Sequence, residues 1–310
     1  MFNIVQKRYW FFGFSALVLL PGIVALLLWG LNLAIDFTGG ALLELRFDQV
    51  DAPPLPGEVT ARLEAMGYTG PIVQTTEEGT VLIRLQEITN EEKEAIKAAL
   101  EAEYGPSTEL RFESVGPVVG QEVTQRAIVA VAAATVGILL YMALAFRNVP
   151  HPFRYGTCAI IALLHDTFIV LGTAAILGHF LGWQVDALFL TAVLTVIGFS
   201  VHDTIVVFDR IRENMHVYKG LPFEDVVNRS IVQTLDRSIN TQLTALFTLT
   251  ALYLFGGVTI KQFIFWLIIG MMSGTYSSIC NAAPLLVAWE KGELTRWLPG
   301  HRKQKKRAPA

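Results

Sequence analysis

The sequence predicts a membrane protein: an all-α bundle of six transmembrane helices, with an α+β, ferredoxin-like extracytoplasmic domain inserted between spans one and two. Apolar residues make up 53% of the chain and charged residues 16%, with a mean hydropathy of +0.47. This composition is typical of integral membrane proteins. Residues 32–126 differ, because they carry 17 acidic and 7 basic side chains, a net charge of −10. We therefore expect an acidic, water-exposed domain within an apolar body.

Six apolar runs are each near or above the roughly 20 residues that a transmembrane helix needs. They are residues 10–34, 127–146, 156–177, 187–208, 238–255 and 263–289. The first run follows Lys7 and Arg8, as in a secretion signal. It is too long for the apolar part of a signal, however, and no small-x-small cleavage site follows it. We expect a retained membrane anchor.

Lysine and arginine in the short connections predict the orientation of the chain. They lie before span one, between spans two and three, between spans four and five, and in the tail: Lys7, Arg8, Arg147, Arg154, Arg210, Arg212, Lys219, Arg229 and the run 302–307. The alternate connections, 178–186 and 256–262, carry only Lys261. Because positive loops stay in the cytoplasm, both termini are expected inside the cell and the acidic domain outside.

Four parts of the chain follow from these assignments. Residues 1–34 hold the cytoplasmic N-terminus and span one, and residues 35–126 hold the external domain with its linkers. Residues 127–289 hold spans two to six, and residues 290–310 form a basic cytoplasmic tail.

The external segment alternates between strand and helix patterns. Strands are expected at 41–47, 71–75, 80–86 and 108–115, and helices at 56–66 and from the Thr89 cap to Glu103. The order β-α-β-β-α-β is the ferredoxin-like arrangement. The segment has no cysteine, no histidine and no phosphate-binding glycine loop. A binding or lever role is therefore favoured over catalysis.

Two glycine-containing linkers join this domain to the membrane body, 36–40 and 115–122. Glycine adopts backbone conformations that other residues resist, and proline stiffens the neighbouring chain. The positions that allow a hinge are Gly39, Gly40, Gly116, Pro117 and Gly120. Tight turns without a moving role explain the same residues equally well.

Asp203 is the most informative single residue, because it lies inside an apolar run, 194–208. A carboxylate in hydrocarbon costs several kcal/mol unless it is paired, hydrated or protonated, and it is by default a functional hypothesis. Arg237, at the mouth of the next run, is expected at a similar depth. Pairing would lower the cost of both charges, and protonation of Asp203 would release the arginine. A purely structural ion pair is the alternative.

Other polar residues in the spans are candidates for a relay or for packing. They are His165, Asp166, His202, Thr204 and Thr241. Thr241 continues from Arg237 along one helical face with Thr244 and Thr248. Hydroxyls in membrane helices often bond only to a neighbouring helix or to their own backbone.

Metal, cofactor and nucleic-acid binding are not expected. The sequence contains two adjacent His-Asp pairs, at 165–166 and 202–203. Neighbours on a helix point about 100° apart, so neither pair chelates well alone. The basic residues are dispersed among loops and the tail, unlike a nucleic-acid-binding surface. Gly270, Gly274, Ser278 and Ala282, spaced by four, predict a face for close helix packing.

The run Ile197-Gly-Phe-Ser-Val-His-Asp-Thr-Ile-Val-Val-Phe-Asp-Arg-Ile-Arg-Glu-Asn214 resembles the signature of the SecF branch of the SecD/SecF family of protein-export membrane subunits. Further matching motifs are Ile35–Gly40, Val115–Gly120, Leu163–Asp166 and the stretch from Asn228 to Arg237. The resemblance covers nearly the whole chain in order. One departure is His202, where many relatives carry asparagine, and this puts the usual pH response in doubt.

The resemblance implies a function as well as a fold. The family belongs to the resistance–nodulation–division superfamily, in which proton or sodium flux drives transport. It implies a subunit in the bacterial plasma membrane that uses this flux to move its external domain and promote protein translocation. Asp203 and Arg237 would carry the relay, together with an aspartate of SecD. The implied partners are SecD, the SecY–SecE–SecG channel with YidC as a further candidate, the exported unfolded polypeptide and the lipid bilayer.

Three other functions remain open from the residues. Half of another proton-coupled exporter, of small molecules or lipids, would share the coupling chemistry. An intramembrane aspartyl protease would use Asp166 and Asp203 with a shared proton, but the Gly-x-Gly-Asp motif is absent. A structural scaffold would need no ionisable pair. We expect no enzyme activity.

Overall fold

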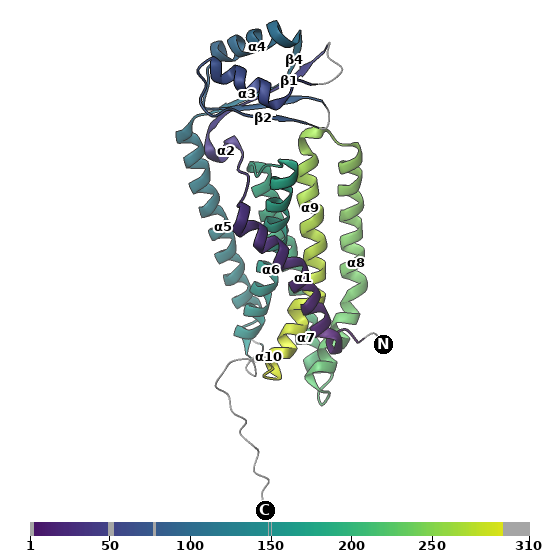
Figure 1. The fold of residues 1–310 in the computed structure, drawn as a ribbon. Coiled ribbons are helices and arrows are strands. Elements are labelled where there is room, and N and C mark those ends of the chain that lie inside the picture. The colour runs from purple at the N-terminus through teal and green to yellow at the C-terminus, as the bar shows by residue number, and fades with distance from the viewer. Residues whose placement is uncertain (1–2, 49–52, 77–78, 148, 150, 294–310) are drawn as a thin grey trace, which may run out of the picture. The chain divides into compact units, whose positions relative to one another are not determined.

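The computed structural model describes residues 3–48, 53–76, 79–147, 149 and 151–293 (Figure 1). The predicted basic tail lies outside the described residues from 294 onward. The chain divides into two compact units. The helical unit comprises Met1–Gly30, Ala133–Ile176 and Thr191–Ala310, and the sheet unit comprises Leu31–Ala132 and Leu177–Leu190.

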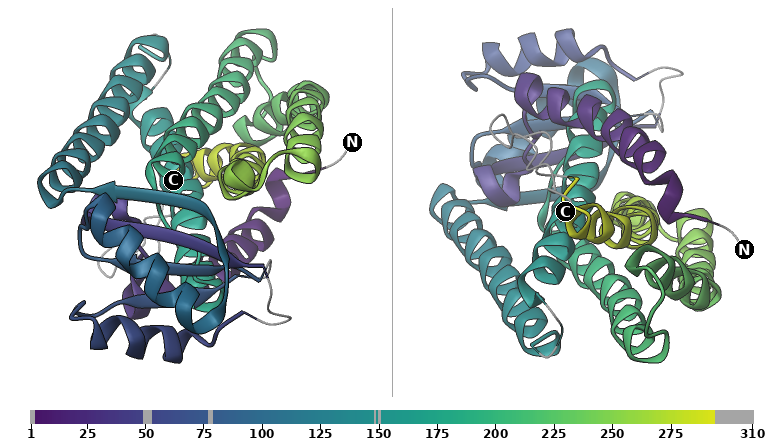
Figure 2. Two further views of the ribbon diagram at one scale, coloured as in Figure 1. Left: turned by 90° about the horizontal axis from the view of Figure 1, so that it is seen from above. Right: turned by 90° about the horizontal axis from the view of Figure 1, so that it is seen from below.

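Long helices dominate the chain. They are α1 (Arg8–Trp29), which follows the short turn η1 (Val5–Lys7), α5 (Pro117–Ala145), α6 (Pro152–Leu181), α7 (Ala187–Val217), α8 (Phe223–Phe255) and α9 (Val258–Ser277). A π-helical turn, η2 (Ser278–Ala282), connects α9 to α10 (Ala283–Glu290). In the views along the helices (Figure 2), α8 lies beside α9, against which it packs.

In the described part of the chain, five helical segments are long and apolar enough to cross a membrane: Val5–Trp29, Pro117–Ala145, Pro152–Leu181, Ala187–Val217 and Ile260–Glu290. The chain is therefore a multi-pass membrane protein. The predicted fifth span, 238–255, is helical but lies within α8, which is not among the five. Asn240, Gln242 and a series of threonines lower the hydropathy of this stretch.

The sheet unit contains a four-stranded antiparallel sheet in the order β2-β3-β1-β4. Its elements are α2 (Ile35–Thr38), β1 (Gly40–Phe47), α3 (Pro56–Ala65), β2 (Ile72–Thr75), β3 (Val81–Leu85), α4 (Asn90–Tyr104) and β4 (Ser107–Val115). From β1 to β4 they follow the predicted order of strands and helices. Helix α4 begins with a capping box, in which Thr89 and Glu92 satisfy each other's backbone N–H groups.

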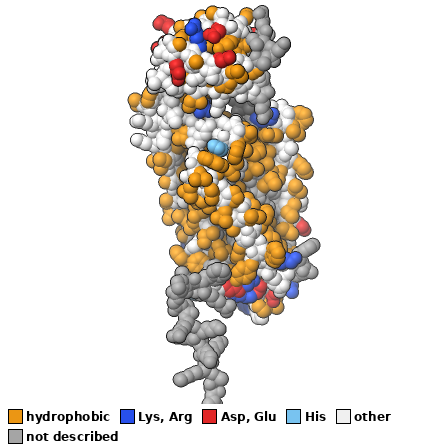
Figure 3. All heavy atoms as spheres, viewed as in Figure 1, with side chains coloured by type: hydrophobic (Ala, Val, Ile, Leu, Met, Phe, Trp, Pro, Cys, Tyr) orange, Lys and Arg blue, Asp and Glu red, His pale blue; other side chains and the backbone are white. Residues whose placement is uncertain are grey.

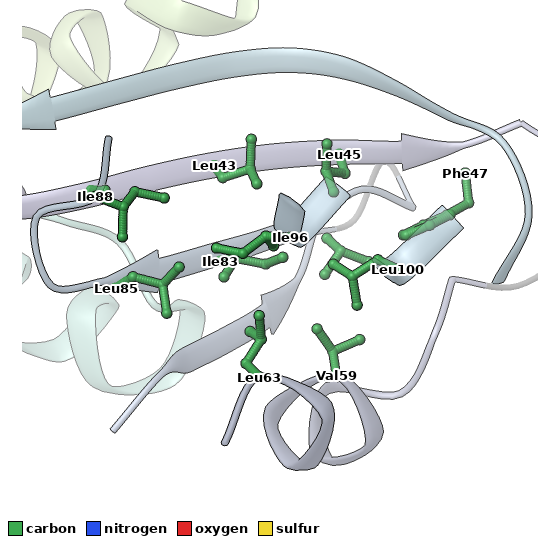
Figure 4. Packing of buried hydrophobic residues seen from close by; sticks show 12 residues of the cluster. Leu43, Leu45, Phe47, Val59, Leu63, Ile83, Leu85, Ile88, Ile96 and Leu100 are labelled. Carbon is green, nitrogen blue, oxygen red and sulfur yellow. The ribbon is translucent and has the colours of Figure 1, made fainter. Parts of the chain in front are cut away.

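One apolar core holds the sheet unit together. Alternate residues of the strands, such as Leu43 and Ile83, point to the same face, where α3 and α4 contribute Leu63 and Ile96 (Figure 4). These four side chains are fully buried. Burial of a large apolar side chain stabilises a fold by about 1.5–3 kcal/mol. The core therefore fixes both helices on one face of the sheet.

Close glycine contacts hold the helical unit together. Gly22 of α1 and Gly172 of α6 meet so closely that a Cβ at Gly172 would lie 2.5 Å from the Cα of Gly22. Gly270 of α9 packs on Val196 of α7 in the same way. Small residues let membrane helices approach each other in this manner, so the predicted packing face that includes Gly270 is confirmed.

Charged side chains secure the start of the chain against the ends of α8 and α10. Buried Arg8 donates to Glu224 (3.1 Å) and to Glu293 (2.5 Å). The side-chain oxygen of Asn228 accepts the backbone N–H of Ile4 (2.9 Å). On the face drawn in Figure 3, the helices present mainly hydrophobic side chains, and charged groups gather at this end of the helical unit. An apolar lateral surface is what a lipid environment requires.

Candidate functional site

Asp203 lies near the middle of α7 and is partly buried. Among the residues that the structure describes, its hydrogen-bond partner is the hydroxyl of Thr275 on α9, which donates to Oδ2 at 3.4 Å. That hydroxyl also lies 3.2 Å from the carbonyl of Met271, one turn earlier on its own helix. Asp203 is therefore an intramembrane carboxylate with one weak donor, and its charge is poorly compensated within the described residues.

Arg237 does not pair with Asp203 in this structure. The ion pairs formed by the described residues do not include one between these two side chains, and Arg237 is exposed on α8. It lines an open cleft of about 520 Å³ formed by residues of α5, α7 and α8. Asp209 and Glu213 also line this cleft, but they pair with Arg212 and Arg210 respectively. Similar depth on consecutive helices therefore did not bring the predicted partners together.

Asp166 of α6 lies at the centre of a buried polar cluster in the helical unit, with 1% of its surface exposed. It accepts hydrogen bonds at 2.6 Å from Ser200 of α7 and from Ser273 and Ser277 of α9. His165 Nδ1 lies 3.0 Å from Oδ1 of the same carboxylate. The carboxylate thus joins three helices. We name these five residues the Asp166 cluster.

His165 and Asp166, predicted as relay or packing residues, are adjacent and in contact. The second ring nitrogen of His165, Nε2, is buried and has no hydrogen-bond partner among the described residues. Its ring lies 6.3 Å from that of Tyr276 on α9. Tyr276 in turn donates to the carbonyl of Phe11 on α1 (2.7 Å). A ring contact and a hydrogen bond therefore connect the cluster, through Tyr276, to α1.

The remaining candidates fall in different environments. Thr204 is buried and bonds to Ser278 (2.9 Å) and to the carbonyl of Ser200 (3.0 Å), at the contact of α7 with η2. His202 and Thr241 are exposed on α7 and α8. Thr204 therefore packs one helix on another, whereas His202 and Thr241 face outward.

Ser273 and Ser277 are polar residues that the sequence analysis missed. Their spacing of four places them on one face of α9, and this signal was available in the sequence. The group to which they bond was not available, because Asp166 lies more than 100 positions away in the chain.

The predicted hinge residues form a tight junction within the sheet unit. Gly39 has a φ of +73°, and a Cβ there would lie 2.8 Å from the Cα of Pro117. A Cβ at Gly120 would lie 2.8 Å from the backbone nitrogen of Gly39, and one at Gly40 would lie 2.6 Å from the carbonyl of Leu85. The nearest atoms to a Cβ at Gly116 belong to a side chain instead. The contacts between backbones leave no room for a side chain at Gly39, Gly40 or Gly120. Hinge motion at these residues stays a prediction.

The junction also reaches the start of α7. Asp36 of the first linker accepts the backbone N–H of Ala187 (2.9 Å), and Asp186 accepts that of Phe189 (2.7 Å). Carboxylates at a helix N-terminus satisfy its unpaired N–H groups and interact favourably with its dipole. Burial raises the pKa of Asp186 above its ordinary value, and the neighbouring charge of Asp36 adds to this effect. Linker and helix are thereby joined.

Within the residues that the structure describes, no group of three or more histidine, cysteine, aspartate or glutamate side chains could hold a metal ion. The chemistry that this arrangement allows is the gain and loss of a proton at carboxylates among the helices.

The fold and the site define a multi-pass membrane protein with an inserted α+β unit and carboxylates enclosed between its helices. Comparison with protein families matches residues 95–292 to "Protein export membrane protein SecD/SecF, C-terminal" and residues 30–49 to the "SecD/SecF GG Motif". The chain belongs to the SecD/SecF family.

Its similarity to individual members extends over almost the whole chain. The protein translocase subunit SecF of Thermobaculum terrenum is 52% identical over 308 residues, which cover 96% of each chain. The SecF subunit of Anaerolinea thermophila is 48% identical, covering 96% of this chain and 97% of the relative. The SecDF subunit of Bacillus subtilis is 35% identical, but the match covers only 39% of that longer protein.

Solved structures show the same relationship. A crystal structure of SecDF from Thermus thermophilus, described as a translocon-associated membrane protein, matches with a TM-score of 0.81 at 32% identity. The match covers 94% of this chain and 39% of that one. A structure of SecDF in a "Super-membrane-facing form" matches with a TM-score of 0.67 at the same identity. The chain is thus similar to about two fifths of the SecDF chain.

Proposed function

We propose that this protein is the SecF-type subunit of a SecD–SecF complex that uses the proton motive force to promote protein translocation across the bacterial plasma membrane at the Sec translocon. Proton transfer at the membrane helices would drive movement of the external domain, which acts on the exported unfolded polypeptide. Full-length similarity to SecF subunits supports the role in translocation. The SecY–SecE–SecG channel and YidC are proposed partners, and sodium is the alternative coupling ion.

The observation that carries the proton role is the environment of Asp203. A carboxylate with a full set of donors must rearrange a donor before it can take a proton, whereas one with a single donor at 3.4 Å changes charge at little cost in hydrogen bonds. Release of the charge also removes the cost of keeping it among apolar helices. Asp203 therefore suits repeated gain and loss of a proton.

The second part of the relay is proposed to form only when SecD binds. Arg237, Thr241, Thr244 and Thr248 are all exposed on one face of α8. The hydroxyls of Thr244 and Thr248 donate to the carbonyls of Asn240 and Thr244 on their own helix. These four side chains stay exposed in the described chain, and a helix of SecD would cover the polar stripe and bring its aspartate to Arg237.

We further infer six spans, with residues 238–255 of α8 as the fifth. A helix whose polar face contacts a protein partner needs less hydropathy than one surrounded by lipid. Six spans place both termini on the cytoplasmic side and the sheet unit outside. The strand order, with α3 and α4 packed on one face, supports a ferredoxin-like external domain.

Replacement of Asp203 by asparagine tests the proton role. The complex with SecD and the channel would be reconstituted in vesicles, and protein export would be measured with and without an imposed proton gradient. Asp203→Asn is expected to abolish the gradient-dependent part of export while the subunit still co-purifies with SecD. Asp225→Asn, which neutralises an exposed carboxylate at the start of α8, is the matched control and should export normally.

Wild-type export by the Asp203→Asn variant would overturn the proposed proton role. Equal loss in Asp203→Asn and Asp225→Asn would do the same, because it would assign the effect to net charge and not to the intramembrane position.

A further inference from the structure

The Asp166 cluster has no part in the proposed relay, although its carboxylate is almost completely buried among the helices. Asp166 is 1% exposed, and the serines that contact it are buried, with Ser277 fully so. A glycine packs beside it: a Cβ at Gly274 would lie 3.7 Å from Asp166 Oδ2 and 3.3 Å from the Cα of Ser200. The cluster therefore occupies a closely packed contact of α6, α7 and α9.

The donors around Asp166 can be counted from the contacts of its two oxygens. Oδ2 accepts from Ser200 and Ser277, and Oδ1 accepts from Ser273. His165 Nδ1, 3.0 Å from Oδ1, is a fourth donor in the tautomer that carries its proton on that nitrogen. An ionised carboxylate accepts about four hydrogen bonds, whereas a protonated acid must donate one itself. The arrangement therefore matches the ionised form.

The same residues also accommodate the protonated form. A serine has one hydroxyl hydrogen and two acceptor lone pairs. Ser277 Oγ lies 2.6 Å from Asp166 Oδ2 and 3.1 Å from the carbonyl of Gly274, so its hydrogen has two acceptors within reach. When a proton adds to Oδ2, Ser277 can turn its hydroxyl hydrogen to the carbonyl of Gly274. Its oxygen then accepts a hydrogen bond from the new hydroxyl group of Asp166. No buried donor is then left without an acceptor.

The cluster is connected to Asp203 through the elements that hold both. Ser200 precedes Asp203 by three residues on α7, which is nearly one helical turn. On α9, Thr275, the donor to Asp203, lies between Ser273 and Ser277. Residues of α7 and α9 therefore take part in the contacts of both carboxylates, and a shift of one helix against the other would change the hydrogen bonds of both.

We propose that Asp166 is a second proton-binding site of this protein, coupled to Asp203 through the contact of α7 with α9. The proton comes from the same gradient, so the coupling rests on the proposed function. It adds to Oδ2 to form an O–H bond and leaves when Ser277 turns back. The other titratable groups described around the site are His165 on α6, Asp203 on α7, Tyr276 on α9 and Cys280 on η2. From α1, the hydroxyl of Ser15 and the carbonyl of Phe11 contact Tyr276.

Infrared difference spectroscopy of the full chain bound to SecD in lipid, between alkaline and acid pH, tests the proposal. A protonated carboxyl group gives its own carbonyl stretching band. Subtraction of the variant spectrum from the wild-type spectrum cancels the bands of the exposed carboxyl groups. Asp166→Asn is expected to remove one band, and Asp203→Asn to remove a different one and shift that of Asp166. Asp225→Asn, the control, should leave both bands in place.

If the folded Asp166→Asn variant gave the same difference spectrum as the wild type, the proposal of a second proton-binding site would be overturned. If the carbonyl band of Asp166 kept its position in the Asp203→Asn variant, the proposed coupling between the two sites would be overturned. If Asp166→Asn fails to assemble, Ser277→Ala replaces it: loss of the acceptor should move the Asp166 band, and an unmoved band contradicts the mechanism. Failure of the proposed function appears separately, as normal export by Asp203→Asn.

Discussion

The sheet unit and the helical unit solve the problem of burial in opposite ways. The interior of the sheet unit is a cluster of apolar side chains, with Leu43, Ile83 and Leu100 fully buried. The helical unit buries Asp166 and a set of serines and threonines, and it brings helices together at glycines. In water, removal of apolar surface drives folding. Between membrane helices that force is missing, so close packing and hydrogen bonds specify the contacts.

The largest effect on stability is expected from a substitution that disrupts the apolar core of the sheet unit. Leu43→Ala leaves a cavity at a fully buried position of β1 and should lower the free energy of unfolding of the sheet unit by about 2–5 kcal/mol. Hydrogen exchange of β1 and β3 peptides in the full chain would measure this loss. Leu110→Ala, at a residue of β4 that is 44% exposed, is the control and should cost far less. Equal losses would mean that the core does not hold the unit.

An intermediate effect is expected where two helices touch through glycine. Gly172→Ala places a methyl group against the backbone of Gly22, and overpacking of this kind costs about 1–3 kcal/mol. Thermal unfolding in lipid nanodiscs would report the change. Gly13→Ala, on α1, has nothing within 4 Å of the new methyl and should be neutral or slightly stabilising. A similar loss in both variants would point to helix propensity and not to the contact.

The smallest expected effect depends on pH. The hydroxyl (2.9 Å) and backbone N–H (3.1 Å) of Ser107 donate to Glu101, and these bonds lower the pKa of Glu101 below its ordinary value. The folded state therefore gains stability above the ordinary pKa and loses it as the pH falls through the lowered one. Glu101→Gln should reduce exchange protection of α4 at neutral pH, and the difference from wild type should vanish in acid.

Ser107→Ala sharpens the same comparison, because it removes one of the two donors and should produce part of the effect of Glu101→Gln. A difference from wild type that persists unchanged in acid would show that the charge of Glu101 is not involved.

Local signals in the sequence predicted the sheet unit well. The Thr89 cap and Gly105 were expected to bound a helix, and α4 runs from Asn90 to Tyr104 between them. Caps, turns and alternating apolar positions act over a few residues, so one sequence contains the whole signal.

The candidate site was predictable only in part. The sequence indicated that Asp166 and Asp203 are polar positions in apolar helices. It did not indicate which way each helix turns about its axis. That rotation places Ser273 against Asp166 and leaves Arg237 exposed, away from Asp203. Such choices depend on contacts between residues far apart in the chain, and for Arg237 we propose that they depend on a partner protein.

The π-helical turn between α9 and α10 has a further genetic consequence. Pro284 lacks a backbone N–H and its ring crowds the carbonyl four residues earlier, so the chain widens there by one residue. Deletion of a single residue in Ser278–Ala282 is therefore expected to remove the extra residue and leave a continuous α-helix with its flanking faces in place. Loss of one codon within the regular part of α9 would instead rotate everything on one side of the deletion by about 100°.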